Sequence, residues 1–356
     1  MSRSGAWRLI ALIGVLALAW SVPASVAADD VNVYANIGAS NLDPALAGLH
    51  PIVYVPNELG ASVTVIDATT LKVVKTIRVG SYPHHVTPAW DLRSLLVNNM
   101  RSNALTVIDP WSIAKVGRVP MAAPYNLYFT PDGTTAIDIA EPLDRIVFYD
   151  RATWANLGRV EIPSRGPDHA DFSADGSYFL VSTEYGGWVY KVDVAQRAIV
   201  GALKVGGSPV DIKLSADSSI FYVANQGRGG VSLVDAMSMT EIGFLPTGAG
   251  THGFAVSRDG TSLYTSNRRA GTISVIDFAT RAVVATWDVG GSPDMLSVSI
   301  DGTQLWASNR WNDNVSVIDT GDGNVMTRIK AGNGPHGLTY FPQPGRFSLG
   351  HNGVYR

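Results

Sequence analysis

The fold is decided by residues 252–289, HGFAVSRDGTSLYTSNRRAGTISVIDFATRAVVATWDV, which contain one complete repeat. Short runs rich in Val, Ile, Thr and Tyr alternate here with Gly, Asn and Asp, a pattern typical of β-strands joined by tight turns. It predicts four strands, over His252–Ser257, Ser262–Ser266, Thr272–Asp277 and Val283–Val289. The Arg258-Asp259-Gly260 turn should join the first two as a hairpin.

The aspartate that ends the third strand recurs along the chain. It stands at intervals of 42, 41, 43, 42, 42 and 42 residues, as Asp67, Asp109, Asp150, Asp193, Asp235, Asp277 and Asp319. Ten residues before it, five repeats have an Asn and the other two have Ala140 and Thr183. A fixed period of about 40–45 residues indicates a propeller or a solenoid, and the strand pattern favours the propeller. A catalytic group is needed once rather than in every repeat, so we interpret the aspartates as turn caps.

We therefore expect an all-β fold, a seven-bladed β-propeller of four-stranded blades. The first repeat, from Ile52, begins at its second strand, whereas Pro335–Phe341 forms a lone first strand at the other end. The C-terminal strand should join the first blade and close the ring, which removes most open sheet edges. The predicted propeller covers 52–342, between an N-terminal extension over 28–51 and a C-terminal tail over 343–356.

These repeats resemble the YVTN-type seven-bladed β-propeller family. The tetrapeptide that names the family is present as Tyr54-Val55-Pro56-Asn57 and Tyr222-Val223-Ala224-Asn225. The Val-Gly-x-x-Pro loop of the family is present at 79–83, 205–209 and 289–293. The resemblance implies the propeller fold and, by comparison with YVTN-type surface proteins, an interaction scaffold as one function. Propellers carry many unrelated activities, so the fold alone does not fix the function.

Composition excludes several classes of function. The 356 residues contain 27 Lys and Arg, 30 Asp and Glu and no cysteine, with a net charge of −3. Disulfides, thiolate metal sites and cysteine nucleophiles are therefore excluded. The near balance of charge excludes a strongly electrostatic grip on nucleic acid.

The first 27 residues have the pattern of a secretory signal peptide. Arg3 and Arg8 flank a basic start, Leu9–Trp20 is an uncharged apolar run, and Ser25-Val26-Ala27 supplies the small residues of a cleavage site. We expect the mature chain to begin near Ala28, to have no transmembrane segment after cleavage, and to be periplasmic, secreted or on the cell surface.

Candidate functional residues stand where the repeats differ from one another. Two positions at the start of each innermost strand contain five of the seven histidines, His84, His85, His169, His252 and His336. Alternation along a strand should send His84 and His85 to opposite faces. The first position therefore predicts one group at the channel mouth, made of His84, His252, Asp294 and His336.

Three imidazoles and one carboxylate suit zinc, copper or iron, with His85 and His169 as less favoured ligands. The alternative is a structural role in which these histidines bond to the backbone of a neighbouring blade. The loops between second and third strands should open onto the same face. These loops contain Arg101, Arg228, Arg268 and Arg310. Their guanidinium groups predict binding of an anionic or haem-like cofactor. The alternative is a solvated charged rim.

Three functions stay open at this point. The favoured one is an exported binding protein that holds a metal ion or an anionic or haem-like cofactor at the channel mouth. In arrangement it would be similar to the histidine-ringed propeller of nitrous oxide reductases or to haem d1 propellers. The second is a scaffold that docks an envelope protein. The third is a lyase- or lactonase-type enzyme with a channel-mouth histidine as general base.

Overall fold

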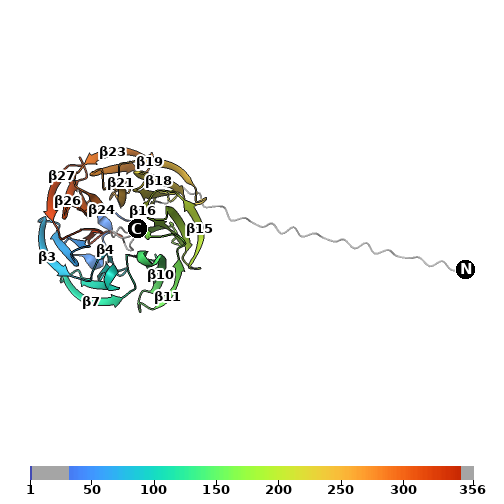
Figure 1. Cartoon of the computed structure of the whole chain (residues 1–356), viewed down its shortest axis with the longest axis horizontal. Helices are drawn as coiled ribbons and strands as arrows, with labels where there is room; N and C mark the ends of the chain where they lie inside the picture. The colour runs from blue at the N-terminus through green and yellow to red at the C-terminus, as the bar shows by residue number, and fades with distance from the viewer. Residues whose placement is uncertain (2–31, 346–356) are drawn as a thin grey trace. The chain divides into compact units, whose positions relative to one another are not determined.

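The structure, a computed structural model, describes residues 32–345 together with Met1. Seven four-stranded antiparallel sheets stand in a ring as the blades of a propeller (Figure 1), as the sequence predicts. The predicted signal peptide lies outside the described residues, as does most of the C-terminal tail. Within the described part, the chain contains no helix long and apolar enough to cross a membrane.

The blades follow the chain in order. Blade 1 contains β28 (Thr339–Phe341), β1 (Ile52–Asn57), β2 (Ser62–Asp67) and β3 (Lys72–Arg78). Blade 2 contains β4 (Pro83–Pro88), β5 (Leu95–Asn99), β6 (Ala104–Asp109) and β7 (Ala114–Pro120). Blade 3 contains β8 (Asn126–Phe129), β9 (Thr135–Ala140), β10 (Arg145–Asp150) and β11 (Asn156–Glu161). Blade 4 contains β12 (Pro167–Phe172), β13 (Tyr178–Thr183), β14 (Trp188–Asp193) and β15 (Ala198–Lys204).

The remaining blades repeat this arrangement. Blade 5 contains β16 (Pro209–Leu214), β17 (Ile220–Asn225), β18 (Gly230–Asp235) and β19 (Glu241–Pro246). Blade 6 contains β20 (Thr251–Val256), β21 (Ser262–Asn267), β22 (Thr272–Asp277) and β23 (Ala282–Asp288). Blade 7 contains β24 (Pro293–Val298), β25 (Gln304–Asn309), β26 (Asn314–Asp319) and β27 (Val325–Lys330). In blade 6 every predicted strand boundary is within one residue of the observed one.

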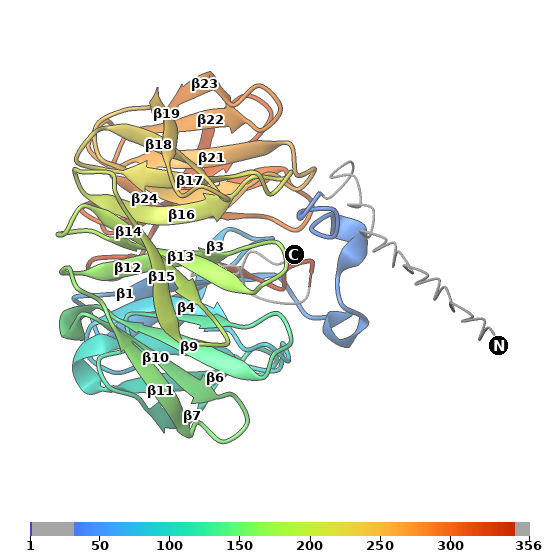
Figure 2. The same ribbon diagram turned by 90° about the vertical axis from the view of Figure 1, so that its right-hand side faces the viewer.

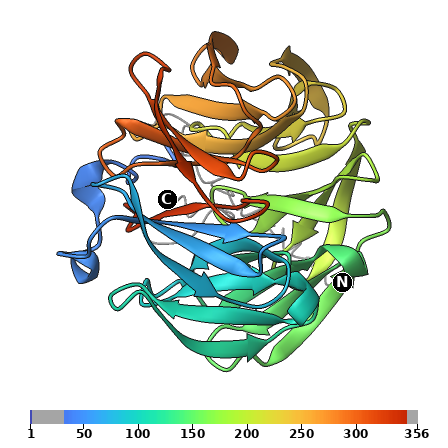
Figure 3. The same cartoon turned by 60° about the vertical axis from the view of Figure 1, so that its left-hand side comes forward.

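The ring closes through the C-terminal strand, as predicted. In blade 1, β28 pairs with β1 in the register Ile52↔Phe341 and Tyr54↔Thr339, and the red strand lies beside the blue ones in Figure 3. The closing strand is shorter than the predicted Pro335–Phe341, because the chain before it makes isolated bridges to two different blades, Asn57↔Pro335 in blade 1 and His85↔Gly337 in blade 2.

The recurrent aspartates cap turns, as interpreted from their repetition. Asp67 Oδ1 accepts the backbone N–H groups of Thr69 and Thr70 at 2.8 and 2.9 Å. The Asn series ties the loop before each innermost strand to the end of the second strand. In blade 1, for example, Asn57 Oδ1 accepts the N–H of Gly332 at 3.0 Å. Both series therefore stabilise the blades.

Burial follows from where each strand stands in its blade. The innermost strands β4, β12, β16, β20 and β24 are buried at every residue, whereas the outermost strand β23 alternates between partly buried and exposed residues. Large apolar side chains fill the space between adjacent blades, so the core is divided into clusters around the ring.

The N-terminal extension packs on one face of the ring (Figure 2). Tyr34 is buried, its hydroxyl donates to the carbonyl of Leu214 at 2.7 Å, and its ring stacks on Phe278. Tyr34 also lies beside Gly260, in a turn between first and second strands. The loops between second and third strands lie at the other ends of these strands and leave the opposite face open.

Candidate functional site

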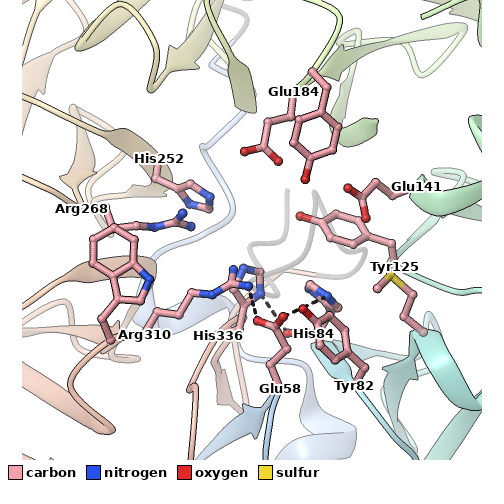
Figure 4. Close-up of a pocket in the computed structure, with 13 residues that line it drawn as sticks. Glu58, Tyr82, His84, Tyr125, Glu141, Glu184, His252, Arg268, Arg310 and His336 are labelled. Atoms are coloured by element: carbon pink, nitrogen blue, oxygen red, sulfur yellow. Dashed lines mark hydrogen bonds and ion pairs between the residues drawn. The ribbon is translucent and has the colours of Figure 1, made fainter. Parts of the chain in front are cut away.

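A cavity of about 410 Å³ opens at the mouth of the central channel (Figure 4). Two positions of the repeat build it. One is the start of the innermost strand, which supplies His84, Tyr125, His252 and His336. The other is the residue directly after the Asn position of the second strand, which supplies Glu58, Met100, Glu141, Glu184, Arg268 and Arg310. The remaining lining residues are Tyr82, Tyr185 and Trp311.

Five histidines pack together at this cavity, and three of them, His84, His252 and His336, line it. The rings of His84 and His85 both lie with their centroids 4.9 Å from that of His336. The ring of His169 lies 5.1 Å from that of His85 and 6.4 Å from that of His252. All five side chains are buried.

The prediction that alternation separates His84 from His85 is wrong. The pairing of β4 with β5 shifts between Pro83 and Val86, so the two histidines together oppose one residue of β5. Such a β-bulge re-aims side chains at the start of a strand. Both rings therefore contact His336, and His85 belongs to the cluster as closely as His84 does.

The predicted metal ligands fall into two overlapping groups. His252, Asp294 and His336 offer ligand atoms that all lie within 4.8 Å of one another, and so do His84, His85 and His336. Three of the four favoured residues thus form one group, and His84 forms the other with His85. His336 belongs to both. His169 lies beside the cluster and forms an ion pair with Asp168.

Contacts with a backbone carbonyl and with Asp294 surround two of these rings. His336 Nδ1 lies 3.3 Å from the carbonyl oxygen of His84, and His336 Nε2 lies 3.6 Å from Asp294 Oδ2. His252 Nδ1 lies 3.0 Å from Asp294 Oδ1. Neither ring nitrogen of His84 has a hydrogen-bond partner among the described residues.

Only two of the four predicted arginines line the cavity. Arg310 forms an ion pair with Glu58, and Arg268 Nε lies 3.0 Å from Asp294 Oδ1. Arg101 and Arg228 stand two and three residues beyond the Asn position instead of directly after it. Arg101 stacks on the Tyr82 ring at 3.7 Å.

Arg228 is turned toward the outer part of its blade. It bonds Glu241 at 2.6 Å and stacks on the ring of Phe244 at 4.1 Å. The arginines that reach the cavity are thus paired with acids, which removes most of the charge basis for an anionic cofactor.

The buried imidazoles are held neutral. Burial first, and then the Arg310 guanidinium, lowers the pKa of His84 and of His336 well below 6.5. Burial and Arg268 do the same to the pKa of His252. In contrast, burial is outweighed at His169 by the Asp168 carboxylate, which raises its pKa.

Two acids on the far wall have the opposite perturbation. Burial, with repulsion from Asp168 and Glu184, raises the pKa of Glu141 to about 8. Burial and the charge of Asp168 raise the pKa of Glu184 to about 7. The sequence places both acids in loops after the second strand of their blades. That their side chains line the cavity depends on the strand register, which the sequence does not show.

Comparison with known proteins agrees with this fold. The model of the YNCE-like beta-propeller family matches residues 16–344. The chain belongs to this family. The match supports a β-propeller family, while the narrower YVTN-type resemblance stays a prediction. No curated protein sequence matches the chain.

Solved propellers are similar in fold. Hydrazine synthase of Kuenenia stuttgartiensis has a TM-score of 0.67 at 20% identity, over 75% of this chain and 92% of that one. The dihydro-heme d1 dehydrogenase NirN has a TM-score of 0.60 at 17% identity, over 82% and 75%. A candidate 6-phosphogluconolactonase from Bacteroides fragilis has a TM-score of 0.66 at 16% identity, over 84% and 100%. At these identities the likeness shows the fold alone.

Proposed function

We propose that the protein binds a single transition-metal ion in the histidine cluster at the channel mouth. The observation that carries the proposal is the pair of three-ligand groups that share His336, each confined within 4.8 Å. Imidazole nitrogens bind zinc at about 2.0–2.1 Å, so nitrogens around one ion stand roughly 3–4 Å apart. Small movements of side chains therefore suffice to bring the groups onto an ion.

The chemistry of the donors fits a first-row transition metal. The imidazoles of His84, His252 and His336 are neutral at pH 7 because their pKa values are lowered by burial and by nearby arginines. Only the neutral ring can donate a lone pair to a metal. Both nitrogens of His84 are buried without a hydrogen-bond partner among the described residues. An unsatisfied buried polar group costs about 1–3 kcal/mol, and a ligated ion would remove that cost.

The bonds around the cluster are of the kind that orient metal ligands. Metal-binding histidines usually direct the second ring nitrogen to a carboxylate or a backbone carbonyl. His252 has such a contact with Asp294, and His336 has one with the carbonyl of His84. In both rings this arrangement leaves Nε2 for the ion. Asp294 is also bound by Arg268, so it can position His252 as well as donate an oxygen.

The test compares metal retention in matched variants. Protein stripped with a chelator is titrated with Zn²⁺ or Co²⁺ and followed by calorimetry, and the purified protein is analysed for metal content. His336→Gln should weaken binding at least tenfold, about 1.4 kcal/mol, because His336 belongs to both groups. His50→Gln is the control, since His50 is exposed and contacts Asp67 far from the cluster. Equal affinity in His336→Gln, or less than one ion bound by the wild type, would overturn the proposal.

We also propose that the protein acts after export, with a chain that begins near Ala28. The basic, apolar and small-residue segments of the first 27 residues support this. Mass spectrometry of the protein from its native host should give a mature start at or near Ala28, and an intact Met1 would contradict export by cleavage.

A further inference from the structure

The two sides of the cavity carry opposite charge. In the position directly after the end of the second strand, blades 6 and 7 have Arg268 and Arg310, whereas blades 3 and 4 have Glu141 and Glu184. Figure 4 shows the arginines on one side of the opening and the two acids on the other. The cavity thus has a side with arginines and an opposite side with acids.

The basic side is already neutralised within the protein. Arg310 is paired with Glu58 and Arg268 with Asp294. Among the described residues, neither Glu141 nor Glu184 forms an ion pair with a cationic side chain. Glu184 accepts a hydrogen bond from the side chain of Gln226, which is neutral. The side of the cavity that lacks an ion-pair partner among the described residues is therefore the acidic side.

Most of the unused polar groups of the cavity are hydrogen-bond acceptors. The carboxylates of Glu141 and Glu184 accept when ionised. The neutral His84 ring, which is only 4% exposed, has one acceptor nitrogen and one N–H group, neither with a hydrogen-bond partner among the described residues, and its Nε2 lies 3.9 Å from Glu58 Oε1. A complementary ligand must therefore carry several donors and positive charge. A primary ammonium group, with three N–H donors and a unit charge, has both properties.

We infer that the cavity binds a small primary amine, with its ammonium group between Glu141 and Glu184. The volume of about 410 Å³ is in the range of small-molecule sites. The rings of Tyr125, Tyr185 and Trp311 give the carbon chain of such a ligand apolar surface. Glu141 and Glu184 belong to neither group of metal ligands among the described residues, so a bare metal ion is not the expected occupant at this wall.

Binding of the amine should also lower the pKa values of the two acids. Burial and the charge of Asp168 raise the pKa values of Glu141 and Glu184 to about 8 and about 7. A cation between them favours their ionised forms, since an opposite charge within a few ångströms stabilises a carboxylate. Binding of the amine should therefore release protons from the protein.

Three probes of matched length test the inference by calorimetry on chelator-treated protein: putrescine, butanediol and succinate. Putrescine should bind, whereas the neutral diol and the dianion should bind at least tenfold more weakly. Succinate binding more tightly than putrescine would overturn the inference, because it would show that the arginine wall dominates. No binding of putrescine would overturn it as well.

Variants locate the binding within the cavity. Glu141→Gln with Glu184→Gln should weaken putrescine at least tenfold, whereas Glu161→Gln, at an exposed acid paired with Arg159, should leave it unchanged. Unchanged affinity in the double variant would also refute the site. The inference does not rest on metal binding, since His336→Gln should keep its affinity for putrescine. Failure of one proposal is therefore distinguishable from failure of the other.

Discussion

The substitution Glu141→Gln should make the protein more resistant to alkaline unfolding. Glu141 is partly buried in the wall of the cavity near Asp168 and Glu184, and these surroundings raise its pKa from 4.5 to about 8. In the unfolded chain the carboxyl ionises near 4.5. The folded state must therefore hold a proton that the unfolded state has already lost. Glutamine has nearly the same shape and no proton to lose.

The sign and size of the effect follow from proton linkage. A group with a raised folded pKa contributes stability that is complete below pH 4.5 and is lost as pH rises through about 8. The two values differ by about 3.5 pH units, and each unit is worth 1.36 kcal/mol, so the upper bound is about 5 kcal/mol. Solvent reaches the open mouth and screens the carboxyl, so we expect about 2 kcal/mol.

Urea denaturation of both proteins at about pH 4.5 and about pH 9 measures this difference. The free energy of unfolding of Glu141→Gln minus that of the wild type should rise by about 2 kcal/mol between the two pH values. Effects of the substitution that do not depend on pH cancel in this comparison. A difference that stays constant with pH, or falls, would refute the account of Glu141 as a carboxyl held protonated by its surroundings.

Three further outcomes are expected. Phe341→Ala in the closing strand should lower the free energy of unfolding by about 3–5 kcal/mol in urea denaturation, because this buried ring packs in the cluster between blades 1 and 2. The control Val116→Ala, on an exposed outer strand, should lower it by less than about 1 kcal/mol. Equal losses in the two variants would contradict the closure of the ring. Asp138→Val should raise the free energy of unfolding by about 1–3 kcal/mol. The Asp138 carboxyl is fully buried without a hydrogen-bond partner among the described residues, and burial raises its pKa. A lower free energy of unfolding in this variant would indicate that the carboxyl stabilises the fold. Metal binding should persist below pH 6.5, because the pKa values of His84 and His336 are lowered. A competition with a chelator at a series of pH values measures this. Loss of half the bound metal near pH 6.5 would contradict the lowered pKa values.

The propeller could be predicted from the sequence because its signals are local and recur in each blade. A cap such as Asp67 bonds backbone groups two and three residues on, so the same turn forms wherever the pattern recurs. Closure was also predictable, since a first repeat without its first strand needs the lone strand at the other end. The short length of β28 was not predictable, because the chain after Gly334 pairs with two blades, through Pro335 with Asn57 and through Gly337 with His85.

The site was predictable only in part, because side-chain direction depends on single-residue register. Repetition identified the histidine positions, but the bulge at Pro83–Val86 overrode the simple alternation and brought His85 into the cluster. Arg101 and Arg228 stand only one and two residues after the lining position, yet neither lines the cavity. The pairing of Arg310 with Glu58 joins blade 7 to blade 1, so no local pattern reveals it.

The lining position after the Asn explains how one fold can carry a differentiated site. In five blades an Asn fixes the backbone before this position, as Asn57 does through its bonds to Ser62, Thr64 and Gly332, whereas Ala140 and Thr183 precede Glu141 and Glu184. The shared strand register therefore presents the next side chain at the channel mouth, whatever its own chemistry. Seven such positions surround one opening, and in this chain they carry acids, arginines, a methionine and a glutamine. Arg310 and Glu58 neutralise each other, whereas Glu141 and Glu184 form no ion pair with a cationic side chain among the described residues. The metal site and the amine site that we propose thus depend on which blade supplies which side chain.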